Sequence, residues 1–280
     1  MQFLFLMITI LVMSSQSVCI KQYNITSKTP NPFLFAAVSS LFAIVITWLP
    51  LGLRFEYSIE VLPYSLGFGI MYVFAIAGMN LAISCGPLAL SSLLISFSLL
   101  IPTVYGIIFL KDPVRLTGCL GIVLLLVSLI LINMQKEEYK ICFKWCIFVL
   151  MAFCGDGITS TILKMQTLHF KGQYQNEFMI VGIGIAFVIM TILAFRKGAM
   201  NEMKGCCKYA SLSGVANGIG NMLLMFMTTL IPNAVLFPSL SAGSQIFLLF
   251  ISLTVYREKI SKRQMVGYMF GILSIVLLNI

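Results

Sequence analysis

The sequence has few charged residues. Only 10% of its 280 residues are Asp, Glu, Lys or Arg, whereas soluble domains carry roughly 25%. Hydrophobic residues make up 60% of the chain, and its mean hydropathy is +1.02. Because a soluble core cannot cover that much apolar surface, the composition excludes a soluble globular domain and predicts an all-α integral membrane protein.

The sequence also lacks the residue groups from which catalytic and metal sites are built. His169 is the single histidine, no GxxxxGK[ST] loop occurs, and the 8 cysteines show no paired CxxC spacing. We therefore expect no enzyme activity, no cofactor and no metal, and we interpret the cysteines as small membrane-helix residues. The +9 net charge comes from bases between apolar runs, where they face lipid headgroups, so we expect no nucleic-acid partner.

Apolar runs fill nearly the whole chain. Since about 20 apolar residues cross the hydrocarbon layer, the length predicts about ten transmembrane helices with short connections. The first run has no Lys or Arg before it, so we assign it to the fold and not to a cleaved signal. The predicted runs are about 1–20, 33–53, 62–84, 88–110, 116–134, 145–165, 177–195, 209–231, 234–256 and 264–280.

The two halves of the chain resemble each other. The charged segment 135–144 divides five runs from five, and an offset of 146 pairs Gly121 with Gly267 and Ser128 with Ser274. Earlier in each half the offset slips to 145 before run four and to 143 at the end of run one. We therefore predict two five-helix repeats, 1–134 and 141–280. Because each has an odd number of crossings, the second is expected to be inverted relative to the first.

A hinge motif recurs in both halves. Asp112 is followed nine residues later by Gly121 and then by Ser128, and Glu258 is followed by Gly267, Gly271 and Ser274 in the same spacing. With the stretch 98–102 before the first hinge, this pattern resembles the EamA-type transporters of the drug/metabolite transporter superfamily. The likeness covers the whole chain, and it implies a ten-helix carrier for metabolites or drugs. The chain departs from the pattern in having Asp112 in place of Glu and no carboxylate in helix one.

One acid lies near the centre of an apolar run. A charge in the bilayer costs a few kcal/mol or more unless it is paired or faces water, so Asp156 is either packing glue or a proton or cation coupling site. Ser160 and Lys164 follow it on one helical stripe. Lys164 and its counterpart Lys21 either snorkel to the headgroups or form a pair of cations in a transport pathway.

Amides gather on the predicted eighth helix. Asn217 and Asn221 lie one turn apart among glycines, and Tyr72 occupies the position of Asn217 in the first half. With Asn80 and Gln245, these residues either line a polar cavity that binds a solute or act as interhelical glue.

Other features have plainer interpretations. Pro102 and Pro238 interrupt helices four and nine and are candidate gating hinges. Asp112 and Glu258 are interpreted as solvated caps, outside any binding site. The GxxxG of Gly267 and Gly271 fits either packing within one chain or a homodimer contact.

The leading hypothesis is an alternating-access carrier for a small-molecule solute, with its site between helices one, three, six and eight and membrane lipids around it. A lipid-carrier flippase would need a basic mouth at Lys21 or Lys164, and a noncatalytic scaffold or sensor would have a dry midplane. Odd-numbered connections hold 13 of the 18 bases, so the positive-inside rule places them in the cytoplasm and both termini outside. Short loops suggest a bacterial cytoplasmic membrane.

Overall fold

The computed structural model describes residues 2–27, 31–52, 55–85, 94–95, 97–111, 116–133, 143–196, 203–255 and 261–279. Within these ranges the chain forms α-helices and short 3-10 turns without any strand, so the all-α prediction is confirmed. The α-helices are α1 (Gln2–Thr26), α2 (Pro32–Trp48), α3 (Leu62–Cys85), α5 (Leu100–Phe109), α6 (Leu116–Asn133), α7 (Phe143–His169), α8 (Gln175–Arg196), α9 (Met203–Leu230), α10 (Asn233–Thr254) and α11 (Lys262–Asn279). Three 3-10 turns are η1 (Leu49–Leu51), η2 (Ile59–Val61) and η3 (Phe97–Leu99).

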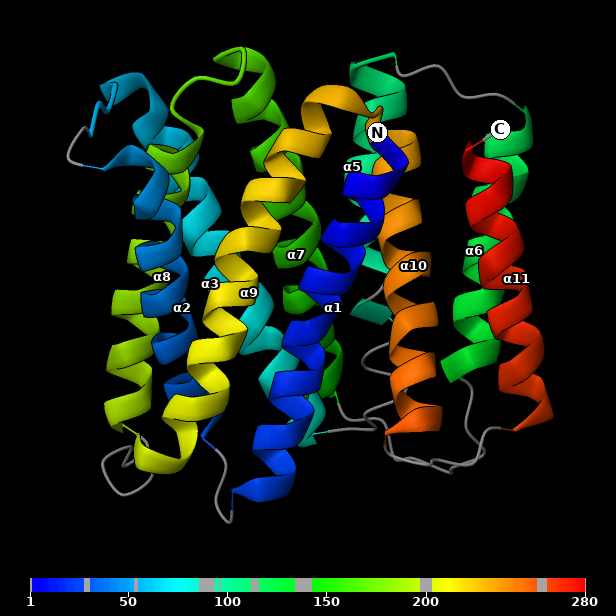
Figure 1. Cartoon of the computed structure of the whole chain (residues 1–280), viewed down its shortest axis with the longest axis horizontal. Helices are drawn as coiled ribbons and strands as arrows, with labels where there is room; N and C mark the ends of the chain where they lie inside the picture. Colours follow the sequence, from blue (N-terminus) through cyan, green and yellow to red (C-terminus); the bar gives the residue numbers. More distant parts are fainter. Residues whose placement is uncertain are drawn as a thin grey trace.

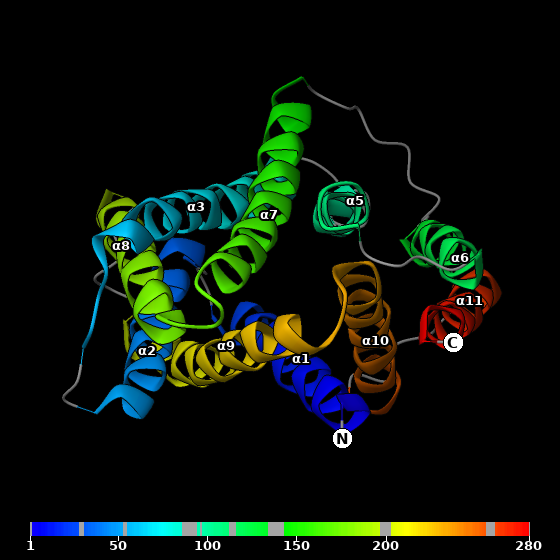
Figure 2. The ribbon, with the colours of Figure 1, turned by 90° about the horizontal axis from the view of Figure 1, so that it is seen from above.

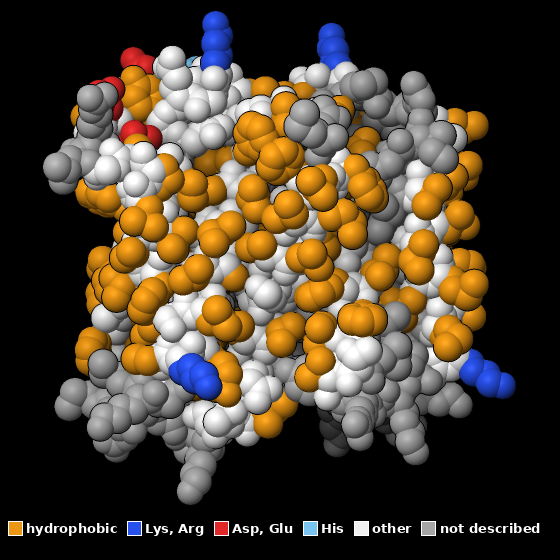
Figure 3. Space-filling view, in the orientation of Figure 1, with side chains coloured by type: hydrophobic (Ala, Val, Ile, Leu, Met, Phe, Trp, Pro, Cys, Tyr) orange, Lys and Arg blue, Asp and Glu red, His pale blue; other side chains and the backbone are white. Residues whose placement is uncertain are grey.

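The helices form one upright bundle whose two chain ends lie at the same end (Figure 1). Six helices of the described chain are long and apolar enough to cross a membrane, and four more contribute shorter apolar stretches. Their flanks expose large hydrophobic side chains such as Leu116 at 79%, Phe143 at 79% and Met269 at 64%. Figure 3 shows apolar side chains over the flank, with charged ones near the two ends. This distribution is the reverse of that of a water-soluble bundle.

Sequence signals explain where helices begin. Asn31 caps α2 through its Oδ1, which accepts from the backbone N–H groups of Phe33 at 3.1 Å and Leu34 at 3.2 Å, while Pro32 takes the first helical position. The Asn31 N–H in turn donates to the Tyr23 hydroxyl of α1 at 3.0 Å. The connection between α1 and α2 is therefore fixed from both sides.

Helix four differs from the sequence prediction. Its described part consists of residues 94–95, the 3-10 turn η3 and the ten-residue α5, and the start of the predicted run 88–110 lies outside the described residues. Pro102 falls in the first turn of α5, where a missing N–H breaks no helical bond. Pro238, by contrast, lies inside α10 as predicted.

The bundle is assembled from tight helix pairs. α3 packs on α7, α1 on α9, α2 on α8, and α6 on α11. Seen from above, the α6–α11 pair forms one edge of the molecule, and α2 with α8 lies at the other side (Figure 2). The Ser128 hydroxyl of α6 donates to the Gly267 carbonyl at 2.6 Å, and Gly271 faces the same serine. The GxxxG face of α11 is thus used within the chain.

Glycines set the closest approach. An added Cβ at Gly155 of α7 would lie 2.5 Å from the Ala75 nitrogen of α3, and one at Gly78 of α3 would lie 2.6 Å from the Ala152 nitrogen of α7. Only residues without a Cβ permit such backbone contact, which maximises van der Waals attraction in a lipid environment.

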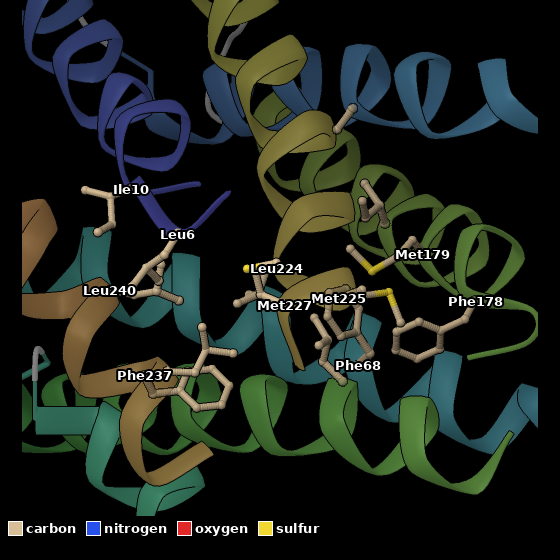
Figure 4. Packing of buried hydrophobic residues seen from close by; sticks show 14 of the residues in the cluster. Leu6, Ile10, Phe68, Phe178, Met179, Leu224, Met225, Met227, Phe237 and Leu240 are labelled. Atoms are coloured by element: carbon tan, nitrogen blue, oxygen red, sulfur yellow. The ribbon is translucent and has the colours of Figure 1, made fainter. Parts of the chain in front are cut away.

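A buried apolar cluster joins seven of the helices, α1, α2, α3, α7, α8, α9 and α10. Figure 4 shows its side chains from α1, α3, α8, α9 and α10 packing together, and they include Leu6, Ile10, Phe68, Phe178, Met179, Leu224, Met225, Met227, Phe237 and Leu240. The cluster holds α1, α9 and α10 against the α3–α8 side, and it therefore frames the polar residues described next.

Candidate solute site

Asn217 is the hub of a hydrogen-bond network inside the bundle. Its Nδ2 donates to Gln16 Oε1 of α1 at 3.0 Å and to the Tyr72 hydroxyl of α3 at 3.0 Å. One turn further along α9, Asn221 Nδ2 donates to Asn217 Oδ1 at 2.6 Å. Both amide hydrogens and the carbonyl of Asn217 are therefore occupied, and three helices are tied together at one level.

The glycines of α9 allow this reach. A Cβ at Gly218 would lie 2.9 Å from Ile46 Cβ of α2, and one at Gly220 would lie 2.9 Å from Met13 Cγ of α1. Because α9 lies so close to α1, the short Asn217 side chain can reach Gln16, while the long Tyr72 side chain of α3 reaches Asn217 from the other side.

Asp156 makes the second polar contact. The Ser98 hydroxyl of η3 donates to Asp156 Oδ2 at 2.5 Å. The Asp156 side chain keeps an exposed surface, although it lies in the middle of the apolar helix α7.

The two contacts belong to one cluster. The Tyr72 hydroxyl lies within electrostatic range of the Asp156 carboxylate, so Tyr72 connects the amide network to the acid. We call this set the polar cluster, and it consists of Gln16, Tyr72, Ser98, Asp156, Asn217 and Asn221. It draws on α1, α3, η3, α7 and α9, which include the four helices in which the sequence places a site.

The structure brings some of the predicted site residues together and does not describe the side chains of others. Asp156, Tyr72, Asn217 and Asn221 come together in the polar cluster, and Ser160 lies half-buried one turn along α7 from Asp156. The side chains of Lys21, Asn80 and Gln245 lie outside the described residues, as do Asp112 and Glu258.

Lys164 requires a correction. The snorkelling interpretation is wrong for this residue, because its side chain is only 6% exposed and its Nζ donates to the Thr228 carbonyl of α9 at 2.5 Å. That carbonyl lies in the last turn of α9, where a cation complements the negative end of the helix dipole. α9 covers the end of α7, and a helix-end position in the sequence gives no sign of such cover.

Gln16 and Ser98 were not selected from the sequence. Gln16 is an amide in the middle of the first apolar run, so the reasoning applied to Asn217 would also have found it. Ser98 stands in the stretch before the first hinge motif, but serines are common in membrane helices and give no strong signal alone.

A metal site is not formed by the described residues, among which no group of three His, Cys, Asp or Glu comes together. His169 ends α7 at the surface, with its ring centroid 4.9 Å from that of Phe170 and 5.9 Å from that of Tyr64. The polar cluster therefore offers hydrogen bonds and a single negative charge as its chemistry.

Comparison with known proteins identifies the fold alone. No family model and no curated protein matches the sequence. A protein solved by crystallography shares the fold over 100% of this chain and 98% of its own chain, with a TM-score of 0.77 and 12% sequence identity. Likeness at that identity defines a class of helical architecture and assigns no activity.

Proposed function

We propose that the chain is an integral membrane carrier that moves a small polar solute by alternating access, with the polar cluster as its binding site. The observation that carries this proposal is Asp156, an acid accessible to water at mid-helix within an apolar bundle. Such a group costs free energy in a membrane protein unless it pairs or faces water, and it is typical of ion and substrate pathways.

Membrane insertion is supported by the distribution of side chains. Six helices have the length and composition to span a bilayer, and their outward faces are apolar. In water this exposed surface would drive aggregation. The resemblance of the hinge motifs to EamA-type transporters agrees with this proposal, and a bacterial cytoplasmic membrane remains the expected location.

We further propose that the halves are inverted repeats. In this scheme α1 corresponds to α7, α2 to α8 and α3 to α9, and Figure 1 shows α1 running down from the N-terminus while α7 runs up. Exchanging the halves turns the pair α3–α7 into α9–α1, and both pairs are present.

Two close glycine contacts support the same symmetry. A Cβ at Gly69 of α3 would lie 2.6 Å from the Gly182 carbonyl of α8, and one at Gly214 of α9 would collide with the Ser39 carbonyl of α2. Gly214 follows Gly69 by 145 residues and Gly182 follows Ser39 by 143, which are the offsets read from the sequence. Contacts related by the exchange of halves are expected from inverted repeats.

The halves differ at the acid. Met13 occupies the position that corresponds to Asp156, 143 residues earlier. A single carboxylate therefore serves the site, and we assign it the coupling charge. The amides and Tyr72 supply the solute contacts.

The alternatives receive less support. A scaffold would have a dry, packed midplane, whereas Asp156 keeps an exposed surface in the middle of α7. A flippase would present a base to a lipid phosphate at Lys164, but this side chain is buried and donates to a carbonyl of α9.

The test is solute flux in sealed proteoliposomes. Uptake and efflux of a mixed panel of metabolites and drugs would be followed under an imposed pH gradient for the wild type, Asp156→Asn, and Glu60→Gln as a control at an exposed acid of η2. Gradient-driven flux that is lost in Asp156→Asn and kept in Glu60→Gln is the expected result. Absence of flux for every solute would contradict the carrier proposal.

A further inference from the structure

The hydrogen-bond valences of the polar cluster restrict the kind of solute that fits it. Both amide hydrogens of Asn217 are used and its Oδ1 accepts one bond, whereas several neighbouring atoms keep free capacity. Among the described residues, Gln16 Nε2, the Tyr72 O–H and the second hydrogen of Asn221 Nδ2 have no acceptor, and Asp156 Oδ1 and Asn221 Oδ1 have no donor. The cluster therefore offers three donor groups and two acceptors without a partner, and one of these acceptors belongs to a carboxylate.

These free atoms are open to a ligand. The described buried side-chain atoms without a partner are Ser14 Oγ, Thr117 Oγ1 and Gln166 Oε1, and none of them belongs to the cluster. The unpaired atoms of Gln16 and Asn221 are therefore not fully buried, and the Asp156 side chain is exposed, so all three residues can exchange water for solute.

The charge balance selects the sign of the solute. Among the described side chains, the cluster holds one carboxylate and no cation, because the nearest base on α7, Lys164, is directed to the Thr228 carbonyl. An anionic solute would be placed beside Asp156 without a compensating charge, which is costly in a partly desolvated site. A protonated primary amine would donate one hydrogen to Asp156 Oδ1 and keep two for Asn221 and water.

We propose that the polar cluster binds a solute that carries an ammonium group together with an amide or carbonyl oxygen, the ammonium at Asp156 and Asn221 and the oxygen at Gln16 and Tyr72. This inference rests on the proposed carrier function, and it adds Gln16 as a residue that determines specificity. Each neutral hydrogen bond contributes about 1 kcal/mol, so loss of the Gln16 donor is expected to weaken binding severalfold.

The test uses three probes that share a primary amide and differ in charge: glycinamide, N-acetylglycinamide and succinamate. Thermal unfolding of the purified protein in detergent reports binding, because a ligand of the native state raises the unfolding temperature. We expect a rise with glycinamide and none with the neutral or the anionic probe. The rise should be lost in Asp156→Asn, reduced in Gln16→Leu, and unchanged in Glu60→Gln.

A further variant separates loss of recognition from loss of folding. Asp156→Glu keeps the carboxylate and should restore part of the glycinamide-induced rise that Asp156→Asn loses. An equal rise with all three probes, a rise with succinamate, or no rise with glycinamide would overturn the proposal.

Flux measurements keep this inference distinct from the carrier proposal. Glycinamide that binds in an Asp156-dependent way but crosses no vesicle membrane would refute the carrier and support the ligand class. Flux of an anionic solute that is insensitive to Asp156→Asn would support the carrier and refute the ligand class.

Discussion

Asn217 donates an amide hydrogen to the Tyr72 hydroxyl at 3.0 Å, although the two residues are 145 positions apart, the offset that relates the proposed repeats in this part of the chain. A contact between corresponding residues maps onto itself when inverted halves exchange their conformations. The Asn217–Tyr72 bond therefore lies near the proposed two-fold axis, and it is expected to persist in both states of a carrier.

The Asn217 side chain should contribute more to the free energy of unfolding than the side chain of Asn221. Asn217→Ala removes three side-chain bonds between and within helices, whereas Asn221→Ala removes one. Since hydrogen bonds between membrane helices contribute roughly 0.6 kcal/mol each, we expect Asn217→Ala to lower the free energy of unfolding by about 1–2 kcal/mol and Asn221→Ala by less than about 1 kcal/mol. Unfolding in mixed micelles with increasing dodecyl sulfate measures both, and equal losses would contradict the hub.

The α3–α7 contact should tolerate no added methyl group. In Gly155→Ala the new Cβ meets the Ala75 nitrogen and the Met71 carbonyl at 2.5 and 2.9 Å, so the backbones must separate. We expect a loss of about 1–3 kcal/mol in the free energy of unfolding. Gly184→Ala on α8 is the matched control, because nothing lies within 4 Å of its new Cβ. It should be neutral or gain up to about 1 kcal/mol from helix propensity, and a similar loss in both variants would contradict the packing argument.

The contact between α7 and α5 should change during transport. A Cβ at Gly157 would lie 2.8 Å from Ile101 Cβ. In the other proposed repeat the corresponding pair is α1 and α10, where Gly243 faces Ile10. By the repeat offsets, Gly243 corresponds to Ser98 and Ile10 corresponds to Phe153. The equivalent contact in the first pair would therefore place Ser98 against Phe153, whereas the structure places it against Asp156. The two registers differ by three residues, about one helical turn. Exchange of the halves would therefore slide α5 along α7 and separate Ser98 from Asp156.

Cross-linking tests this slide. On a cysteine-free background, a bridge between Ile101→Cys and Gly157→Cys should stop flux, and reduction should restore it. The control bridge joins Ile46→Cys to Gly218→Cys across α2 and α9, where the Cβ atoms would be 2.9 Å apart. When the halves exchange conformations, the α2–α9 pair takes the arrangement now seen in the α3–α8 pair. Because α3 and α8 are packed together in the structure, α2 and α9 should stay in contact in both states, and this bridge should leave flux intact. Arrest by both bridges, or by neither, would contradict the exchange.

The orientation follows from the basic side chains. Lys144, Arg196, Lys208, Lys262 and Arg263 lie near the helix ends that are remote from the termini, whereas Lys111 and Lys171 lie near the terminal end. The positive-inside rule then predicts that both termini are extracytoplasmic. In a bacterial host, a C-terminal alkaline phosphatase fusion should be active and a green fluorescent protein fusion dim, and the opposite pair of results would reverse the orientation.

Composition and hydropathy predict the helical class because apolar runs of membrane length leave few other structures possible. The energetic cost of an acid in an apolar run also indicates Asp156 as a candidate site residue. The spacing of the two amides in the eighth run indicates Asn217 and Asn221. The partners of these residues depend on which helices become neighbours, and so Ser98 and the buried setting of Lys164 could not be read from local sequence. Gln16 belonged to the predictable part, since a lone amide in an apolar run carries the same signal as Asn217.

The Asp156–Ser98 bond has an energetic consequence for a carrier with inverted halves. Halves that matched at every position would make the two end states equivalent by a two-fold rotation and therefore equal in free energy. Here the corresponding pair is Met13 and Gly243, which can form no side-chain hydrogen bond, so only one of the two states gains this contact. A bond to a charged group contributes roughly 1.5–3 kcal/mol, and access of water puts this one at the lower end, which favours one resting state about tenfold. The binding site of the empty protein would therefore face one side of the membrane most of the time. A solute that binds Asp156 would weaken the bond to Ser98 and allow the change to the other state.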